Sequence, residues 1–299
     1  MKKQPCPACG MTTESPRIIW RYTTTDLRQC AHCGLVFHAN FSSFFHDHVA
    51  TIYSLGSWGT QGGGVYSIEN HLARLTSTLK FATPYVDLSS LRGKKILDVG
   101  SGIGLAIDAI EAMVGSDHGI ELTLIEPAEE LSQLLIDKFP SATVIPSHVN
   151  ALETLQQEFD LILCLGVDYL FEDIERAFRT LSNHLTCHGT MIVSRNVFLD
   201  MPCYFGGAPI LSCEDLFSPN PLINAYFLES HYQSFLKRNF QLLAHNTVPE
   251  YHAGQLIVEM SNYVLQRKDP TTEEKDTGEE FLQAYTDKIN SLTSTELIS

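Results

Sequence analysis

The chain has 299 residues, of which 44% are hydrophobic and 18% charged, a balance typical of globular proteins. This length accommodates one α/β domain of about 200 residues and one or two small additions. The longest apolar stretch, Phe159 to Phe171, is interrupted by two aspartates and is too short to span a bilayer. The net charge of −15 repels phosphate backbones, which argues against a nucleic acid partner and favours a small molecule. The first residues lack the apolar segment of a secretory signal, so we expect a cytoplasmic protein.

Two C-x-x-C-G motifs lie near the start, Cys6 with Cys9 and Cys30 with Cys33. Because two-residue gaps let both sulfurs of a motif reach one tetrahedral ion, the spacing predicts a four-cysteine zinc ribbon over 1–40. Redox disulfides and a rubredoxin-like iron site are the alternatives. Four thiolates fill a tetrahedral shell, so a zinc ion there would be structural. The module carries five Lys or Arg against two acids, which suits either an anionic partner or a solvated charged face.

A connecting stretch over 41–93 follows the cysteine motifs. It contains a glycine-rich segment over 56–64 and then a helical pattern from about Ser67 to Phe81, where three leucines share one face. We expect a mobile loop that leads into a helix on the substrate side.

From Lys94 onward, short β-rich runs alternate with helical patterns. The expected strands are Lys95–Val99, Leu122–Ile125, Thr143–Pro146, Phe159–Leu165 and Thr190–Ser194. The expected helices are Gly104–Val114, Ala128–Phe139 and Asp173–Leu185. This alternation predicts an α/β fold with a doubly wound parallel sheet.

The end of the chain changes character. A helix near Phe227–Phe240 precedes two expected strands, Gln241–Val248 and Leu256–Leu265, which we predict to form a hairpin. The acidic stretch 268–299 predicts a largely disordered tail with one short helix near Glu279–Ile289.

The turn after the first expected strand reads Asp98-Val99-Gly100-Ser101-Gly102-Ile103-Gly104. Glycines there permit a tight turn and close approach of the backbone to a ligand. The dinucleotide spacing G-x-G-x-x-G/A fails at Leu105, and Asp98 precedes the first glycine by two residues. The pattern resembles motif I of class I S-adenosylmethionine-dependent methyltransferases. The resemblance covers about residues 90–265 and implies a Rossmann-like, seven-stranded sheet within a catalytic domain over 94–267, with an insertion at about 196–226.

The resemblance also implies how the cofactor is bound. The glycine turn would wrap the methionine portion and ribose, with Asp98 helping to hold the amino group. Glu126, at the end of the next strand, matches the acid that accepts both ribose hydroxyls; a solvated carboxylate is the alternative. His148 departs from the acid that the family usually has beside the adenine, and Val149 would pack on the ring. The implied cofactor-binding residues are Asp98, Gly100, Ser101, Gly102, Gly104, Glu126, Pro127, His148, Val149 and Leu165, the last beside the transferable methyl.

A sulfonium methyl is already activated, so transfer depends on an acceptor held in line, with a base if the acceptor is an alcohol or an acidic carbon. The best-placed candidates follow the fourth and fifth strands and are Asp168, Tyr169, Arg195 and Asn196. Asp168 could instead cap the next helix. Arg195 could either anchor a carboxylate or phosphate or form a salt bridge within the fold. Three more residues could reach the cleft from outside the sheet, or have only structural roles: His71, Tyr66 and His231.

A ribbon fused to such a core resembles bacterial methyltransferases that act on sugars or other small metabolites. We therefore expect a small-molecule acceptor such as a sugar nucleotide or an acidic metabolite. A methyltransferase acting on RNA or protein is one alternative, and a continuous basic path from Arg17, Arg21 and Arg28 to the cleft would favour it. A non-catalytic, cofactor-binding scaffold is the other.

Overall fold

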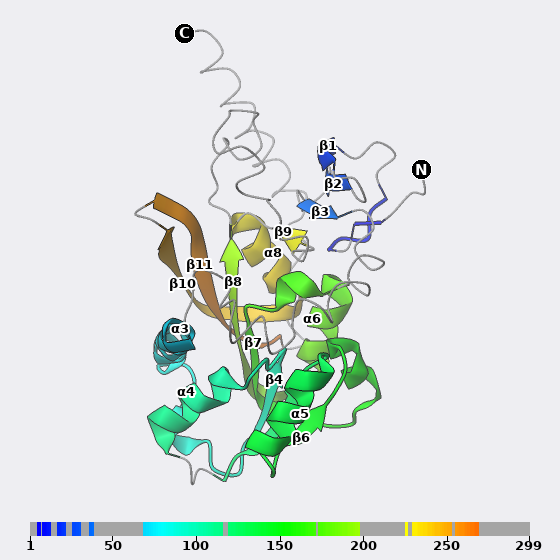
Figure 1. Ribbon diagram of the computed structural model, residues 1–299. Coiled ribbons are helices and arrows are strands. Elements are labelled where there is room, and N and C mark those ends of the chain that lie inside the picture. Colours follow the sequence, from blue (N-terminus) through cyan, green and yellow to red (C-terminus); the bar gives the residue numbers. More distant parts are fainter. Residues whose placement is uncertain are drawn as a thin grey trace.

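The computed structural model describes residues 5–6, 8–12, 17–21, 26–30, 36–38, 68–115, 119–171, 173–197, 225–226, 229–252 and 255–268. Its main feature is a seven-stranded sheet with the strand order β10-β11-β8-β7-β4-β5-β6 (Figure 1). The strands are β4 (Lys95–Val99), β5 (Glu121–Ile125), β6 (Thr143–Ile145), β7 (Phe159–Leu165), β8 (Leu185–Val197), β10 (Phe240–His252) and β11 (Gln255–Arg267). The doubly wound, Rossmann-like sheet expected from the sequence is thereby confirmed.

The strand order indicates the edge of the sheet at which a ligand would bind. Strands β6, β5, β4, β7 and β8 run parallel, whereas β11 is antiparallel to β8 and β10 is antiparallel to β11. The chain moves outward from β4 to β5 and β6 and then returns to the other side of β4 for β7. Open α/β sheets bind ligands at the carboxyl ends of the strands where the order reverses in this way.

Helices cover both faces of the sheet, and two buried clusters fill the spaces between. The helices are α3 (Ile68–Ala82), α4 (Leu105–Val114), α5 (Glu129–Lys138), α6 (Ile174–Asn183) and α8 (Glu229–Asn239). One cluster contains residues of α3, α4 and α5, and the other contains residues of α6 and α8. Successive residues of β7 alternate between the clusters: Leu161 and Leu163 join the first, Ile162 and Cys164 the second. This alternation follows from the two-residue period of a strand and explains why β7 is apolar from Leu161 to Leu165.

The last three strands are longer than the apolar pattern predicted. Strand β8 begins at Leu185, ahead of its expected start at Thr190, and so includes His188 and Gly189, with an irregular register against β7. A Cβ on Gly189 would lie 2.8 Å from the carbonyl oxygen of Phe159, so two backbones approach closely there. Strands β10 and β11 also exceed their expected bounds, because the hairpin ladder continues into polar residues.

A smaller sheet holds the cysteine-bearing module. Its strands are β1 (Arg17–Arg21), β2 (Asp26–Gln29), β3 (Val36–His38) and β9 (Ala225–Tyr226), in that order. Pairing of β3 with β9 joins the module to the end of the predicted insertion (Figure 1). None of the helices described combines the length and apolar composition that crossing a bilayer requires. The glycine-rich segment, most of the insertion and the acidic tail from 269 onward lie outside the described residues.

Candidate active site

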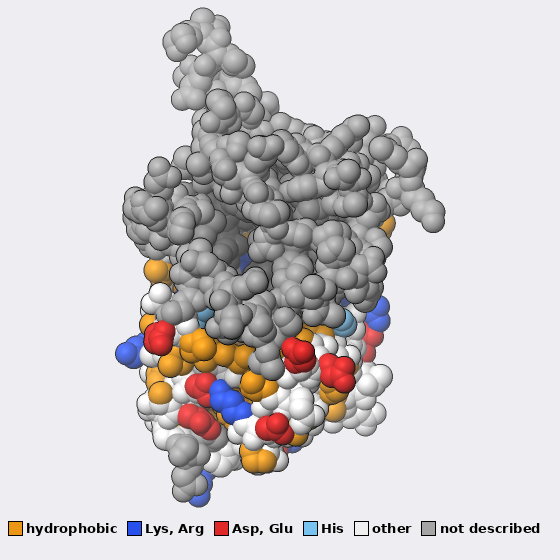
Figure 2. Space-filling view, in the orientation of Figure 1, with side chains coloured by type: hydrophobic (Ala, Val, Ile, Leu, Met, Phe, Trp, Pro, Cys, Tyr) orange, Lys and Arg blue, Asp and Glu red, His pale blue; other side chains and the backbone are white. Residues whose placement is uncertain are grey.

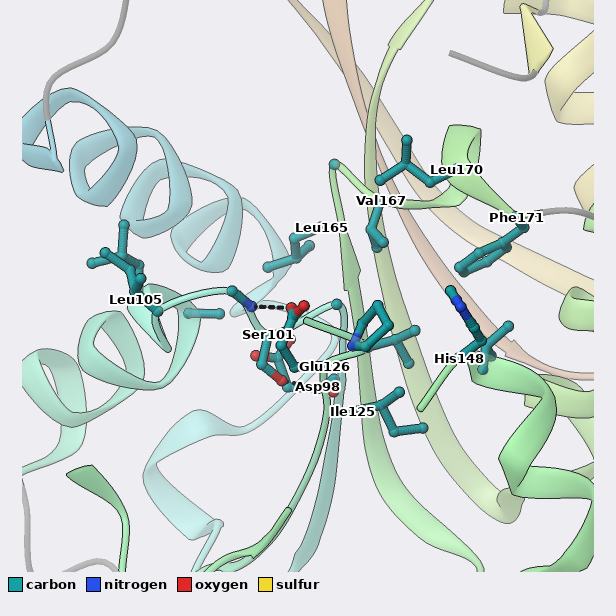
Figure 3. Close-up of a pocket in the computed structure, with 18 of the residues that line it drawn as sticks. Asp98, Ser101, Leu105, Ile125, Glu126, His148, Leu165, Val167, Leu170 and Phe171 are labelled. Atoms are coloured by element: carbon teal, nitrogen blue, oxygen red, sulfur yellow. Dashed lines mark hydrogen bonds between the residues drawn. The ribbon is translucent and has the colours of Figure 1, made fainter. Parts of the chain in front are cut away.

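A cavity opens at the carboxyl ends of β4, β5 and β7, where the strand order reverses. Figure 3 shows acidic side chains from β4 and β5 at one side of it, and His148 and Phe171 at the other. Nine of the ten residues expected to bind the cofactor line this cavity: Asp98, Gly100, Ser101, Gly102, Glu126, Pro127, His148, Val149 and Leu165. The tenth, Gly104, lies at the N-cap of α4 in a left-handed conformation. The fold therefore brings the predicted set together in one place.

The glycine turn is tightly fixed against its neighbours. The backbone N–H groups of Gly100 and Ser101 both donate to the carbonyl oxygen of Ile125, at 2.8 and 3.0 Å. Gly100 has a φ of 68°, and a Cβ there would overlap the side chain of Val167. Left-handed geometry and this close contact together restrict the position to glycine. The turn thus exposes backbone to the cavity where a bound ligand can approach it.

Glu126, at the end of β5, connects the two neighbouring turns. Its Oε2 accepts a hydrogen bond from the Gly102 N–H at 2.9 Å (dashed in Figure 3), and its Oε1 accepts one from the Ala128 N–H at 2.9 Å. Burial raises the pKa of this carboxyl, and the two backbone donors oppose that rise. Each oxygen keeps a second lone pair, so a carboxylate held in this way can also accept from a pair of neighbouring hydroxyls.

Asp98, the penultimate residue of β4, is 2% exposed and lies beside Glu126 (Figure 3). Burial, with a smaller contribution from the Glu126 charge, raises the pKa of Asp98 to about 7. Its Oδ2 has no hydrogen-bond partner within the part of the chain that the structure describes. A buried acceptor left in this state is costly unless a ligand satisfies it. The position therefore fits a cationic donor such as a ligand ammonium group.

The opposite wall of the cavity is mostly apolar. Val149 begins the short 3-10 helix η2 (Val149–Thr154), directly after His148, and both residues line the cavity. Leu170 and Phe171, from the turn that follows β7, lie on the same side of the cavity as His148 (Figure 3). An apolar surface of this kind suits a flat aromatic ring. No motif in the sequence marks Leu170 and Phe171 as residues of the cavity.

The structure corrects the predicted roles of Asp168 and Arg195. Both are buried, at 0% and 1% exposure, and Arg195 Nη1 donates to Asp168 Oδ2 at 2.7 Å. The Tyr232 hydroxyl donates to the same oxygen at 2.7 Å, and the Arg195 guanidinium lies 4.4 Å from the centre of the Tyr232 ring. Neither charged side chain is among the residues that line the cavity. Arg195 therefore forms a salt bridge within the fold, which was the alternative to the anchor role, and Asp168 is its partner.

The residue that caps α6 also differs from the expected one. Asp168 opens the 3-10 helix η3 (Asp168–Leu170), whereas the cap of α6 is Asp173, which accepts from the Arg176 N–H at 2.9 Å. The backbones of Tyr169 and Asn196 lie in η3 and β8, but their side chains are outside the description. The same holds for His231 in α8, and Tyr66 lies wholly outside the described residues.

Helix α3 contributes side chains that sequence reasoning identified only in part. His71, Arg74 and Leu75 line the cavity, and His71 alone had been named as a candidate. His71 and Arg74 are three residues apart and so share a helix face. The three-residue spacing is visible in the sequence. It indicates a place in the site only when α3 is known to lie over the strand ends.

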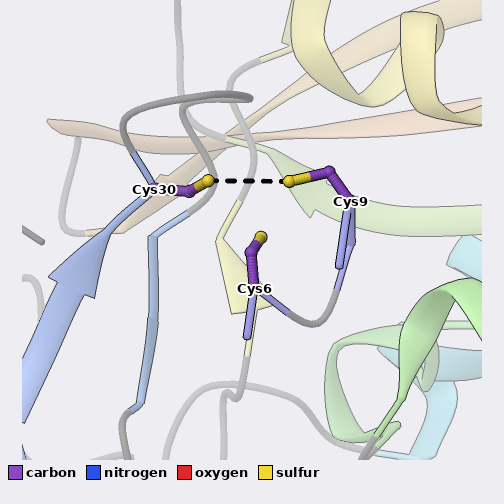
Figure 4. Close-up of side chains that lie close together, drawn as sticks. All are labelled: Cys6, Cys9 and Cys30. Carbon is purple, nitrogen blue, oxygen red and sulfur yellow. Dashed lines mark hydrogen bonds between the residues drawn. The ribbon is translucent and has the colours of Figure 1, made fainter. Parts of the chain in front are cut away.

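Three of the four predicted metal ligands meet in the front module. The sulfurs of Cys6, Cys9 and Cys30 lie within 4.8 Å of one another and point to a common centre (Figure 4). The Cys9 and Cys30 sulfurs are 3.7 Å apart, whereas a disulfide requires about 2.05 Å. Tetrahedral zinc with bonds of about 2.3 Å separates its sulfur ligands by about 3.8 Å. Cys33, the fourth predicted ligand, lies outside the described residues.

The module is also packed on the domain that contains the seven-stranded sheet. Cys6, Ala8 and Cys30 are buried in the same hydrophobic cluster as residues of α6 and α8. The Arg238 guanidinium, in the last turn of α8, donates to the Ala8 carbonyl oxygen at 3.1 Å. The first cysteine motif is therefore held against α8 of that domain.

Comparison with known proteins identifies the family. A family profile described as "Methyltransferase domain" matches residues 69–245. No curated protein matches the chain. The N-methyltransferase NodS from Bradyrhizobium japonicum WM9, solved in complex with S-adenosyl-L-homocysteine, shares the fold with a TM-score of 0.50 and 14% identity over 77% of this chain and 100% of that one. The cyclopropane synthase MmaA2 from Mycobacterium tuberculosis has a TM-score of 0.50 and 11% identity over 63% of this chain and 84% of that one. The chain belongs to the methyltransferase domain family and is a class I S-adenosylmethionine-dependent methyltransferase.

Proposed function

We propose that the protein transfers the methyl group of S-adenosylmethionine to a small-molecule acceptor, and that the cavity at the ends of β4, β5 and β7 is where this happens. The observation that carries the proposal is the buried Asp98 carboxylate, whose Oδ2 lacks a partner among the described residues at the wall of that cavity. An ammonium group on the ligand would supply the missing donor and stabilise the charged carboxylate.

The other residues each have a role that their contacts support. Glu126, already aligned by two backbone donors, would accept from the ribose hydroxyls. Val149 and Phe171 would enclose the adenine ring, with His148 at its edge. The glycine turn would approach the ribose and methionine portion through its backbone. The bound cofactor supplies an activated methyl group, so what this chain must provide is orientation and exclusion of water.

A small acceptor suits the charge of the chain better than a nucleic acid does. The net charge is −15, and the described face in Figure 2 shows basic and acidic side chains interspersed. The basic path that would favour RNA starts at Arg17, Arg21 and Arg28, whose side chains lie outside the description. The scaffold alternative predicts cofactor binding without turnover, and release of S-adenosylhomocysteine from S-adenosylmethionine in the presence of acceptors would exclude it.

We also propose that residues 1–40 form a zinc ribbon, with Cys6, Cys9, Cys30 and Cys33 as ligands and a structural role for the ion. The sulfur spacing supports zinc over a disulfide. The remaining divisions follow the sequence: a linker and substrate-side helix over 41–93, the catalytic domain over 94–267 and an acidic tail over 268–299.

Calorimetric titration with S-adenosylmethionine and separately with NADH, with metal analysis of the same sample, tests both proposals. Micromolar binding of S-adenosylmethionine alone and about one zinc per chain are expected. Binding of NADH alone would overturn the cofactor assignment. The Cys9→Ser variant should lose zinc and expose the front module to protease, while Cys164→Ser, which alters a buried cysteine of β7, should retain the metal. Full zinc content in Cys9→Ser would refute the ribbon.

A further inference from the structure

One cation faces the proposed cofactor cavity from outside the sheet. Arg74 belongs to α3 and, with His71 and Leu75, lines the cavity at the carboxyl end of β7. Its Nη2 lies 3.2 Å from His71 Nδ1 and 3.9 Å from where a Cβ on Gly166 would be. Gly166 is itself fixed, because its N–H donates to the Ser194 carbonyl oxygen at 2.6 Å. The guanidinium therefore lies beside Gly166, a residue at the end of β7 that is held by its backbone and has no side chain.

Arg74 differs in the sign of its charge from the acidic residues that line the cavity. Asp98, Glu126 and Asp173 are the acids that line the cavity, and Arg74 is the one lining residue in the described chain with a permanently positive side chain. An acidic wall repels a carboxylate on a ligand unless a cation is placed near it. A guanidinium offers two parallel N–H donors, the geometry that matches a carboxylate.

We propose that Arg74 binds a carboxylate at this end of the cavity, with His71 as the neighbour that orients the guanidinium. This inference rests on the proposed cofactor site. Such a carboxylate has two sources: the amino acid portion of S-adenosylmethionine, or an acidic acceptor. In the first case Asp98 holds the ammonium and Arg74 the carboxylate of the same α-amino acid, so each charge meets its opposite. In the second case Arg74 takes over the acceptor anchor that the sequence suggested for Arg195.

The proposal is tested by Arg74→Gln, compared with Lys80→Gln on the same helix. Lys80 is exposed and does not line the cavity, so the control removes the same charge from α3 at a distance. Calorimetry would measure two ligands: S-adenosylhomocysteine, which carries the carboxylate, and methylthioadenosine, which lacks it. Malonate, titrated into protein saturated with S-adenosylhomocysteine, probes a separate carboxylate site.

If Arg74 binds the cofactor, Arg74→Gln weakens S-adenosylhomocysteine binding about ten- to hundredfold and leaves methylthioadenosine unchanged. If it binds an acceptor, both adenosine ligands are unaffected and malonate binding is lost. Arg74→Lys, which keeps the charge but not the fork of donors, should fall between the wild type and Arg74→Gln in either case.

Equal losses for both adenosine ligands in Arg74→Gln would overturn the proposal, because they indicate a general disturbance of the cavity. Unchanged binding of all three probes would overturn it too. Failure of the wild-type protein to bind either adenosine ligand is a different result, since it contradicts the proposed cofactor site itself. Matching unfolding midpoints for Arg74→Gln and Lys80→Gln would show that both variants fold.

Discussion

Replacing Asp98 with asparagine should make the ligand-free protein more stable and its cofactor binding weaker. The side chain keeps its shape and loses the charge that burial disfavours. Burial and the Glu126 charge raise the pKa of Asp98 from 3.8 to about 7. A difference of about three pKa units at about 1.4 kcal/mol each corresponds to a free energy on the order of 4 kcal/mol, which relaxation of the site would reduce.

The sign of the effect gives it a distinctive pH dependence. A carboxyl whose folded pKa is raised stabilises the fold below its unfolded pKa, and that stabilisation is lost as pH rises through the folded value. For Asp98 the loss therefore develops between about pH 4 and pH 7. The free energy of unfolding of Asp98→Asn, relative to wild type, should increase over this range and level off near pH 8.

Urea denaturation of ligand-free protein at pH 4, 5, 6, 7 and 8 would measure this difference. Asp137→Asn serves as the control, because Asp137 is exposed on α5 and no pH-dependent gain is expected there. Calorimetry should show weaker S-adenosylhomocysteine binding by Asp98→Asn at pH 8. A stability difference that does not vary with pH, or a less stable Asp98→Asn protein at pH 8, would refute the reasoning.

Three further substitutions test other parts of the site. Glu126→Gln should weaken S-adenosylhomocysteine binding about tenfold by calorimetry while leaving the unfolding midpoint almost unchanged, and undiminished affinity would contradict the ribose role. Gly100→Ala should lose both binding and stability because its φ of 68° and the contact with Val167 exclude a Cβ; wild-type affinity would show that the turn can adjust. Arg195→Met should lower the free energy of unfolding by about 3–5 kcal/mol, since it leaves the Asp168 charge buried, and adding Asp168→Asn should recover part of that loss in urea denaturation. No recovery in the double variant would argue against the ion pair as the cause.

The local elements of this protein were predictable from sequence because their signals are local. Strand β4 was predicted with its observed bounds, Lys95–Val99, from a short apolar run ended by glycines. The turn after it must bend within a few residues, which only glycines at those positions allow. Asp98 and Glu126 lie at the carboxyl ends of two adjacent parallel strands, so their meeting at one edge followed from the alternation of strands and helices.

The pairing of Arg195 with Asp168 could not be predicted from sequence. Both follow strands expected from the sequence to reach the functional edge, and the pattern therefore assigned them to the cleft. Side chains of a strand alternate between its two faces, so a shift of one residue decides whether Arg195 points into the fold or outward. Tyr232 of helix α8, 64 residues along the chain from Asp168, supplies a hydroxyl that donates to the same carboxylate. No local signal links these residues.

Sequence patterns were enough to predict the order of strands and helices, the glycine turn with its two acids, and the cysteine motifs, because periodicity, turn geometry and ligand spacing each act over a few residues. The tertiary structure alone decided which distant side chains meet: Arg195 with Asp168, β3 with β9, and Arg74 with the cavity. These contacts depend on how helices pack across a sheet, and many sequences with the same local pattern would pack different side chains there.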